Sequence, residues 1–561
     1  MHGTTGYRFA NVVNGLFVDP TADTRMTRTY HSFIGDETDF EECARRSRRL
    51  ILRTSLSSEL TVLTSRLQRI ARADRNTRDF TFTTLRDGLA EVIASFPVYR
   101  TYIDDHVRPE DRRYIEWAVT RARSQSRAAD VGVFDFLRDA LTCELPTRSP
   151  ALGVAVRHFA RKFQQLTSPV MAKGIEDTTF YIYNRLASLN DVGGDPSEFG
   201  MPRERFHRAS ANRARHWPHT MLATSTHDNK RSEDVRMRIN VLSEMVPAWR
   251  LQLRKWHRLN LDKKTEVEGA MAPTRNDEYL LYQVLLGSYP AERPRGKALK
   301  PWRERIQAYM LKATREAKLH TSWANPNAAY EEATSKFVER ILEDTPANGF
   351  FEDFFANVQT VMWLGFLNSL SMVVVKYTSP GLPDLYQGNE MWDFSLVDPD
   401  NRRPVDYALR QRLLQEISAL AADDARIPSV FEDLHDGRSK LFVTHRLLAL
   451  RNEREELFTH GSYTALRTTG ARARNLVAYA RRQGGQACVV IAPRLMAALD
   501  IAPDRLPCGA QTWSDTRVDV PFLAEGDVLR DAITGREHAV RGGGLSVAEV
   551  LASAPVAVLV R

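Results

Sequence analysis

Apolar residues recur at intervals of three and four positions through much of this chain, which is the period of an amphipathic helix. The runs SSELTVLTSRLQRIARA (57–73) and TLRDGLAEVIASF (84–96) follow this spacing. It continues through residues 36–165 and 232–345, and it returns in KLFVTHRLLALRNEREELF (440–458). The pattern therefore predicts two large helical blocks and one further helix close to residue 450.

Short β-rich runs replace this pattern after residue 461. NLVAYARR (475–482), ACVVIAPRL (487–495) and VAVLVR (556–561) are separated by Gly, Pro and Asp. Such runs are typical of strands joined by turns. We therefore expect residues 462–561 to form a small terminal β domain.

Three shorter segments also read as strands that end in loops. They are GLFVD (15–19), MLATST (221–226) and the apolar segment before Pro380, whereas DVGGDPSEFGMP (191–202) reads as a loop. The expected organisation has six parts: a late barrel strand and loop (1–35), a helical insertion (36–165), a barrel strand with active-site loops (166–231), a second helical insertion (232–345), the last barrel strand and helix (346–461), and the terminal β domain (462–561).

Composition narrows the class of protein. A chain of 561 residues is too long for one compact core, and 43% hydrophobic with 26% charged residues is ordinary for a globular protein. No uninterrupted apolar run of 18 residues occurs, and the N-terminus has no signal-peptide pattern. Four widely spaced cysteines form no CxxC pair. We expect a cytoplasmic protein with reduced thiols, no metal site and no membrane partner.

The formal net charge of +8 raises the question of nucleic-acid binding. The basic residues are spread along the chain and interleaved with acids, as in CARRSRRLILR (43–53). No recognised nucleic-acid-reading motif accompanies them. We therefore expect solvated helix faces and no nucleic-acid partner.

The sharpest chemical motif is THDNKRSEDVR (226–236), which follows the predicted strand MLATST. Ser232 and the acids after it read as a helix cap and an acidic first turn, so His227, Asp228 and Lys230 fall in a loop between a strand and a helix. Catalytic groups of (β/α) barrels lie at this position. A carboxylate beside an imidazole offers an acceptor and a donor to neighbouring sugar hydroxyls.

A second cluster lies in VMAKGIEDTTFYIYNRLASLNDVGGDP (170–196). Charged side chains there precede a group of aromatic ones, namely Lys173, Glu176 and Asp177 before Phe180, Tyr181 and Tyr183. Sugar rings stack on aromatic faces while their hydroxyls bond to charged groups. The other interpretation is a capped helix whose aromatic side chains belong to the core.

A third cluster lies in SPGLPDLYQGNEMWDFSLVDPDNRRPVDY (379–407). Pro380 and Pro383 indicate a turn, which Tyr386, Glu390 and Trp392 follow. Acids among turn residues favour a functional loop over a linker.

Together with GTTGYRFANVVNGLFVD (3–19) and DGRSKLFVTHRLLALR (436–451), these segments closely resemble the maltooligosyltrehalose synthases, a branch of the α-amylase superfamily. The resemblance covers essentially the whole chain. It implies a partial (β/α) barrel, containing only the late strands, with large helical insertions and a C-terminal β-sandwich. The family converts the reducing-end α-1,4 linkage of a maltooligosaccharide into an α,α-1,1 linkage, an isomerisation in trehalose biosynthesis that needs no cofactor.

The resemblance also implies roles for particular residues. Asp228, paired with His227, would be the third catalytic carboxylate, which holds sugar hydroxyls and stabilises the transition state. The resemblance also places the substrate beside Lys230, Glu176, Asp177, Tyr183, Tyr386 and Trp392.

A retaining glycosidase also needs a nucleophilic carboxylate and an acid/base about 5–5.5 Å apart. In the family both precede the GTTGYxF segment, which begins here at Gly3. We therefore expect the nucleophile, the acid/base and the early strands to be absent. The expected substrate is a maltooligosaccharide or α-glucan, and the expected protein partner is an N-terminal companion polypeptide that carries the missing strands.

Two other functions stay open. One is a glucan hydrolase of the same superfamily, which separation of trehalose-ended products from glucose and maltose would distinguish. The other is a non-catalytic glucan-binding or complementing half of a split enzyme, which would bind maltooligosaccharide without turnover.

The expected lack of a catalytic pair is directly testable. The chain expressed alone should form no non-reducing product from maltopentaose, because Asp228 cannot replace a nucleophile and an acid/base. Chromatography of the reaction mixture measures this. Robust turnover would contradict the expectation.

Overall fold

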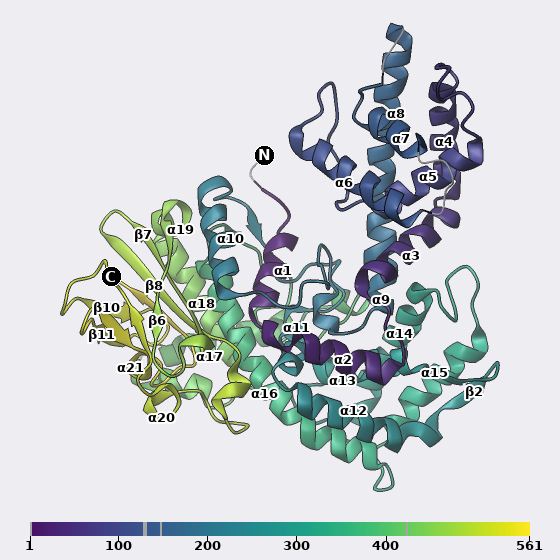
Figure 1. Cartoon of the computed structure of the whole chain (residues 1–561). Coiled ribbons are helices and arrows are strands. Elements are labelled where there is room, and N and C mark those ends of the chain that lie inside the picture. The colour runs from purple at the N-terminus through teal and green to yellow at the C-terminus, as the bar shows by residue number, and fades with distance from the viewer. Residues whose placement is uncertain (1–2, 127–131, 146–148, 422–423) are drawn as a thin grey trace. The chain divides into compact units, whose positions relative to one another are not determined.

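The computed structural model describes residues 3–126, 132–145, 149–421 and 424–561, and it has a helix-rich α/β fold with small sheets (Figure 1). The chain divides into two compact units. Unit 1 comprises residues 1–36, 184–313 and 327–561, and unit 2 comprises residues 37–183 and 314–326.

Unit 2 is helical. Its main helices are α3 (Phe40–Arg53), α4 (Ser57–Ala71), α5 (Phe82–Ala94), α6 (Pro109–Gln125), α7 (Gly132–Leu141) and α8 (Pro150–Met171). Buried leucine, isoleucine, valine and phenylalanine side chains fill the space between these helices. Helices α4 and α5 confirm the periodicity in 57–73 and 84–96. A π-helix, η2 (Ala172–Thr179), follows α8 and leads into α9 (Phe180–Ile182).

Unit 1 contains one long helix, α16 (Gly349–Thr378), which packs against several of the other helices of the unit. The others are α1 (Tyr7–Leu16), α2 (Asp23–Ile34), α10 (Arg203–His216), α11 (Glu233–Asn240), α12 (Val246–Asn260), α13 (Arg275–Ser288), α15 (Ala328–Ile341), α17 (Tyr407–Ala421), α18 (Arg438–Glu453) and α19 (Glu455–His460). Helix α14 (Leu299–Ala317) runs from unit 1 into unit 2.

Helix α16 is long and apolar enough to cross a membrane, but 89% of its most apolar 18-residue window is buried inside the protein. It packs against α11, α18 and the C-terminal sheet, as a core helix does. The strand predicted before Pro380 is therefore wrong, because α16 continues to Thr378. A segment that is apolar on every face has no period that distinguishes a buried helix from a buried strand.

Two of the predicted strands change in the structure. GLFVD is not a strand, because α1 continues to Leu16 and residues 3–36 contain no strand. Phe9, Val12, Val13 and Leu16 are buried at helical spacing. The strand predicted at 221–226 shrinks to β1 (Met221–Leu222), which pairs in parallel with β4 (Leu382–Pro383).

Residues 462–560 hold a C-terminal β region of two antiparallel sheets. The six-stranded sheet has the order β11 (Glu537–Ala539), β10 (Val528–Asp531), β13 (Ala557–Val560), β8 (Gln486–Pro493), β7 (Leu476–Gln483), β5 (Ser462–Ala465). The smaller sheet has the order β12 (Gly544–Ser546), β9 (Arg517–Asp519), β6 (Thr468–Thr469). Strands β7, β8 and β13 confirm the runs predicted at 475–482, 487–495 and 556–561.

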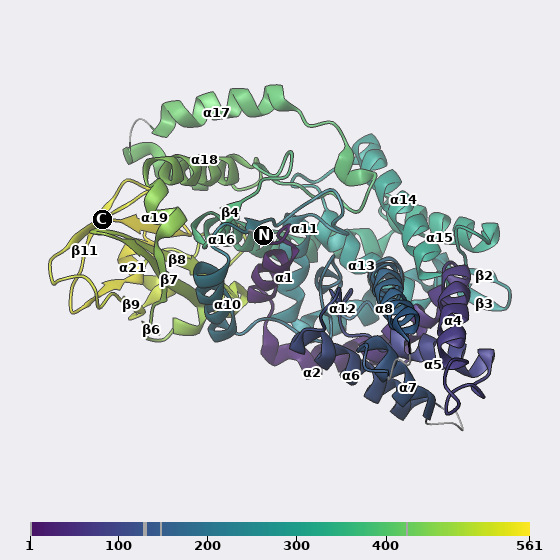
Figure 2. The same ribbon diagram turned by 90° about the horizontal axis from the view of Figure 1, so that it is seen from above.

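The large sheet of this region lies against the helical part of unit 1. Helix α16 packs on β8, and α19 packs on β7. Figure 2 shows α17 and α18 side by side at the edge of this region. A separate hairpin of β2 (Thr265–Val267) and β3 (Ala270–Ala272) contacts α15.

Close packing of α11 on α16 depends on Gly365. A Cβ atom there would meet Arg238 Cγ and lie 3.1 Å from Arg238 Cα. Arg238 cannot move aside freely, because it is fully buried and its guanidinium carbon lies 3.5 Å from the centroid of the Phe394 ring. Gly365→Ala should lower the free energy of unfolding by about 1–3 kcal/mol through overpacking.

Urea denaturation of the purified variants measures this loss. Gly349→Ala is the matched control, because it lies at the start of the same helix with only Leu259 Cδ2 within 4 Å of its Cβ position, at 3.7 Å. Equal stability of the two variants would contradict the proposed tight contact.

Candidate functional site

The loop between β1 and α11 carries the predicted His–Asp pair. His227 Nε2 lies 3.2 Å from Asp228 Oδ2, and the two side chains are 60% and 53% exposed. The pair is therefore accessible from solvent, and it follows the end of a strand that belongs to a parallel pair.

The buried carboxylate of Asp191 anchors this loop through hydrogen bonds. Its Oδ1 accepts hydrogen bonds from Asn229 Nδ2 at 2.7 Å and from the backbone N–H of Lys230 at 3.2 Å. Its Oδ2 lies 3.8 Å from Arg236 Nε. Lys230 itself is 6% exposed. These contacts fix the backbone of the loop, while the side chains of His227 and Asp228 are exposed to solvent.

The GTTGYRF segment packs against the same loop. Gly6 has a φ of 94°, and a Cβ there would lie 2.6 Å from the backbone nitrogen of Ala223, so only glycine permits this approach. The Tyr7 hydroxyl then shares a hydrogen bond of 3.2 Å with Thr226 Oγ1, immediately before His227.

A buried cluster of four charges lies at the start of α11. Lys440 Nζ from α18 is 2.8 Å from Glu233 Oε1 and 2.8 Å from Asp234 Oδ2. Lys376 Nζ from α16 is 3.6 Å from Glu233 Oε2 and donates to Thr224 Oγ1 at 3.0 Å. All four charged side chains are 1% exposed or less.

Burial and charge act in opposite directions in this cluster. Burial by itself would raise the pKa of Glu233, but Lys376 and Lys440 outweigh it and hold that pKa below its ordinary value. Burial raises the pKa of Asp234, with Lys440 opposing this shift and Glu233 adding to it. Lys440 is therefore the shared partner of two competing carboxyl groups.

The serine predicted to cap α11 makes a different hydrogen bond in the structure. Ser232 occupies the N-cap position, but its side chain makes no capping bond and its hydroxyl donates to the backbone carbonyl of Asp393. Ser225 Oγ accepts from the N–H of Glu233 in its place, at 2.9 Å. The acidic first turn of α11 is confirmed, yet it faces the interior.

The segment after β4 meets the His–Asp loop. Asn401 Nδ2 donates to the carbonyl of His227 at 3.1 Å, and Arg402 Nη2 lies 3.9 Å from Asp228 Oδ1. The Tyr386 hydroxyl donates to the carbonyl of Asn401 at 3.0 Å. The predicted residue Tyr386 therefore contacts Asn401, and Asn401 in turn contacts the His–Asp loop.

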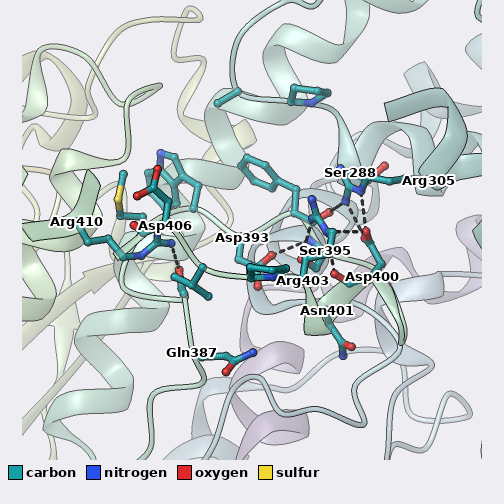
Figure 3. Close-up of a pocket in the computed structure, with 18 of the residues that line it drawn as sticks. Ser288, Arg305, Gln387, Asp393, Ser395, Asp400, Asn401, Arg403, Asp406 and Arg410 are labelled. Atoms are coloured by element: carbon teal, nitrogen blue, oxygen red, sulfur yellow. Dashed lines mark hydrogen bonds and ion pairs between the residues drawn. The ribbon is translucent and has the colours of Figure 1, made fainter. Parts of the chain in front are cut away.

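The same segment also lines a polar cavity of about 420 Å³ (Figure 3). Its lining consists of Gln387, Gly388, residues 391–395, 400–401 and 403–406, together with Ser288, Pro290, Ala291, Arg305, Arg410, His435 and Asp436. Arg305 holds Asp400 at 2.8 Å, and Arg403 Nε is 3.0 Å from the same carboxylate. Burial would raise the pKa of Asp400, but Arg305, the backbone N–H of Leu396 and Arg403 together outweigh it and lower that pKa.

Trp392 lies in this cavity wall and not beside the His–Asp pair. Its ring stacks on Phe366 at a centroid distance of 4.7 Å, and its indole N–H donates to the carbonyl of Leu434 at 2.5 Å. Glu390 is paired with Arg410. These contacts give Trp392 a packing role in addition to its cavity surface.

The remaining predicted residues lie in unit 2. Glu176 accepts from the Tyr99 hydroxyl, and Asp177 Oδ2 lies 2.7 Å from Lys173 Nζ on the π-helix η2. Tyr183 is 5% exposed and packs edge-on against Phe40 at 5.6 Å. The aromatic neighbours Phe180 and Tyr181 are also buried, as the core interpretation of this segment requires.

In the ranges that the structure describes, no group of three or more His, Cys, Asp or Glu residues is placed to hold a metal ion.

Comparison with known proteins adds the relatives of this chain. A maltooligosyltrehalose synthase structure from Arthrobacter ramosus is 34% identical and superposes with a TM-score of 0.80, covering all of this chain and 64% of that one. A Sulfolobus tokodaii structure titled as a hypothetical maltooligosyl trehalose synthase is 27% identical, with a TM-score of 0.70. The Mycobacterium tuberculosis protein named "Putative maltooligosyl trehalose synthase" is 30% identical over 569 residues.

The chain is homologous to the maltooligosyltrehalose synthases. It spans 63% of the length of the curated relatives that it matches. No protein-family profile matches the chain. The similarity to maltooligosyltrehalose synthases extends over the whole of the present sequence, both units included.

Several residues of the site are absent from the sequence-based prediction. The His–Asp loop, or the first turn of α11 that follows it, is in contact with Tyr7, Asp191, Arg402 and Lys440. All four lie inside segments that carry the family resemblance, so the motifs contained a signal for them. The Tyr7 contact joins residues 219 positions apart and the Lys440 contact joins residues 206 positions apart, while the other two join separate loops. No local sequence pattern reveals such contacts.

The buried cluster makes Lys440 a sensitive position. Lys440→Met should lower the free energy of unfolding by about 3–5 kcal/mol, because two buried carboxyl groups lose their shared cation. Lys336→Met, which removes an exposed pair 2.6 Å from Glu332, should change it by less than about 1 kcal/mol. Chemical denaturation of both variants provides the comparison, and equal losses would contradict the assigned role of Lys440.

Proposed function

We propose that this chain supplies the glucan-holding, transition-state-stabilising part of a maltooligosyltrehalose synthase active site. In the proposed reaction the reducing-end α-1,4 linkage of a maltooligosaccharide becomes an α,α-1,1 linkage. Asp228 and His227 bind the sugar hydroxyls, and no cofactor takes part.

The observation that carries the proposal is the presentation of His227 and Asp228. The pair is solvent-exposed at the end of a strand, while the residues on both sides of it are anchored by Asp191, Tyr7 and Asn401. A fixed backbone under exposed polar side chains is the arrangement that a binding site requires. Homology to maltooligosyltrehalose synthases over the whole chain supports the same substrate class.

The chemistry follows from the positions of the charges. Asp228 accepts hydrogen bonds from two neighbouring hydroxyls of a glucosyl ring, and these bonds strengthen as the ring gains oxocarbenium character. Arg402 Nη2, 3.9 Å from Asp228 Oδ1, places a positive charge beside this carboxylate. Tyr386 and Lys230 complete the proposed cleft.

The proposed architecture is the late part of a (β/α) barrel. The parallel pairing of β1 with β4, each followed by a loop that reaches the His–Asp pair, supports it. In barrels of this kind the loops after the strands form the active site.

Asp228→Asn tests the proposal. The substitution keeps the shape of the side chain and removes the charge, so hydrogen bonds to sugar hydroxyls lose about half of their strength. The dissociation constant for maltopentaose should rise roughly tenfold, equivalent to about 1.4 kcal/mol. Isothermal titration calorimetry measures the change.

Asp504→Asn is the matched control, since Asp504 is an exposed acid in the C-terminal region that does not line the polar cavity of Figure 3. It should bind maltopentaose as the unmodified protein does. An unchanged dissociation constant in the Asp228 variant would overturn the proposed role of this carboxylate.

A further inference from the structure

The guanidinium group of Arg402 lies beside Asp228. Arg402 is the last residue of η7 (Asp400–Arg402), and its Nη2 is 3.9 Å from Asp228 Oδ1. The two side chains are 51% and 53% exposed. N–H···O hydrogen bonds in proteins span about 2.7–3.2 Å. The opposite charges are therefore close together in an accessible place, without a direct hydrogen bond between them.

The backbone that carries Arg402 is held on two sides. Asp400, at the start of η7, accepts hydrogen bonds from Arg305 at 2.8 Å. Asn401 donates from Nδ2 to the carbonyl of His227 at 3.1 Å, which ties η7 to the loop that contains Asp228. The spacing between the guanidinium and the carboxylate is therefore set by the fold and does not depend on two freely moving surface side chains.

Arg402 differs from the neighbouring arginines in what it binds. Arg305 and Arg403 both pair with Asp400, at 2.8 Å and 3.0 Å. Within the described part of the chain, Asp228 is the one carboxylate within 4 Å of the Arg402 guanidinium.

Most hydrogen-bond donors of Arg402 are also unused by the protein. An arginine side chain carries five N–H donors. In the described ranges Arg402 uses one of them, in a hydrogen bond of 3.5 Å from Nη2 to the carbonyl of His227. The guanidinium therefore keeps donors for a ligand that approaches Asp228.

A sugar hydroxyl has the chemistry that joins these two groups. Its oxygen accepts a hydrogen bond from a guanidinium N–H, and its hydrogen is donated to a carboxylate oxygen. Such bonds are about 2.9 Å and 2.7 Å long, so one hydroxyl oxygen can reach both atoms of a pair separated by 3.9 Å. His227 Nε2 lies 3.2 Å from Oδ2, the other oxygen of Asp228, which leaves Oδ1 for this contact.

The pair of opposite charges also selects among sugars. A sugar ammonium group would be repelled by Arg402, and a sugar carboxylate would be repelled by Asp228. A neutral hydroxyl is attracted by both, and hydrogen bonds to ionised groups are the strong ones.

Tyr386 adds an aromatic surface to the pair. Burial raises the pKa of Tyr386, Arg402 opposes this shift, and Asp393 and Asp228 add to it, so the ring lies near both charges. The ring is only partly buried. An aromatic face beside hydrogen-bonding groups suits the C–H face of a pyranose.

We propose that Arg402 is a substrate-binding residue of the His–Asp site, and that its guanidinium and the Asp228 carboxylate hold the same hydroxyl of the reducing-end glucosyl unit. The inference rests on the proposed function, because Asp228 must contact the sugar. It adds a residue to the site and a reason why the site prefers a neutral glucan to a charged sugar.

Arg402→Met tests the contact, since it keeps the aliphatic stem and removes every donor. The dissociation constant for maltopentaose, measured by isothermal titration calorimetry, should rise roughly tenfold. Arg467→Met is the matched control, because Arg467 Nε lies 4.0 Å from Asp519 Oδ2 in an exposed pair of the C-terminal β region. The control variant should bind maltopentaose as the unmodified protein does.

A charged ligand separates direct contact from support of the loop. Maltopentaose oxidised to a carboxylate at its reducing end should bind the unmodified protein weakly, because Asp228 repels it. Asp228→Asn removes this repulsion and leaves the guanidinium, so binding of the oxidised sugar should tighten roughly tenfold. Adding Arg402→Met should abolish this gain, whereas a residue that only supports the loop would not produce it.

The outcomes distinguish this inference from the proposed function. If Asp228→Asn weakens maltopentaose binding and Arg402→Met does not, the role of Arg402 is overturned and the proposed function stands. If the oxidised sugar gains nothing in the Asp228 variant, or if the gain survives in the double variant, the role of Arg402 is likewise overturned. If neither variant changes maltopentaose binding, or the unmodified protein does not bind it, both are overturned.

Discussion

The ion cluster around Lys440 is the interaction on which the candidate site depends. A single ammonium group joins the first turn of α11 to helix α18, and it also donates to the carbonyl of Met391 at 3.2 Å. Asp234 in turn accepts from the backbone N–H of Asp393 at 2.8 Å. The His–Asp loop and the segment after β4 are therefore tied to the same buried charges.

This arrangement explains why so many charged residues lie in the interior of unit 1. Buried charges are costly unless each is paired, and a cluster of two acids and two lysines pairs all of them. The cluster also orders the fold, because its two acids from α11 pair with one lysine from α16 and one from α18. Loops anchored to such a cluster can leave His227 and Asp228 exposed without losing their position.

Glycine contributes to the same order through close approach. Gly365 allows α11 and α16 to pack at short distance, and Gly6 allows the segment before α1 to contact the strand that leads to Asp228. Gly6 lies in a segment that carries the family resemblance. Their effect is steric, since a single Cβ atom at either position would overlap a neighbouring residue.

The sequence by itself determined the local features of this protein. Helical spacing predicted α4, α5 and α18, β-rich runs predicted β7, β8 and β13, and the motifs predicted both the family and the loop position of Asp228. Local spacing failed where a segment is apolar on every face, as in α16, because burial removes the period that separates a helix from a strand.

Only the tertiary structure decided which side chains gather around the site. It buried Tyr183 and its aromatic neighbours, turned Trp392 toward Phe366, and brought Lys440 to Asp234 across 206 residues of sequence. It also placed Arg402 beside Asp228. Contacts of this kind depend on how complete helices pack against one another, and packing is a property of the folded chain and not of any local pattern.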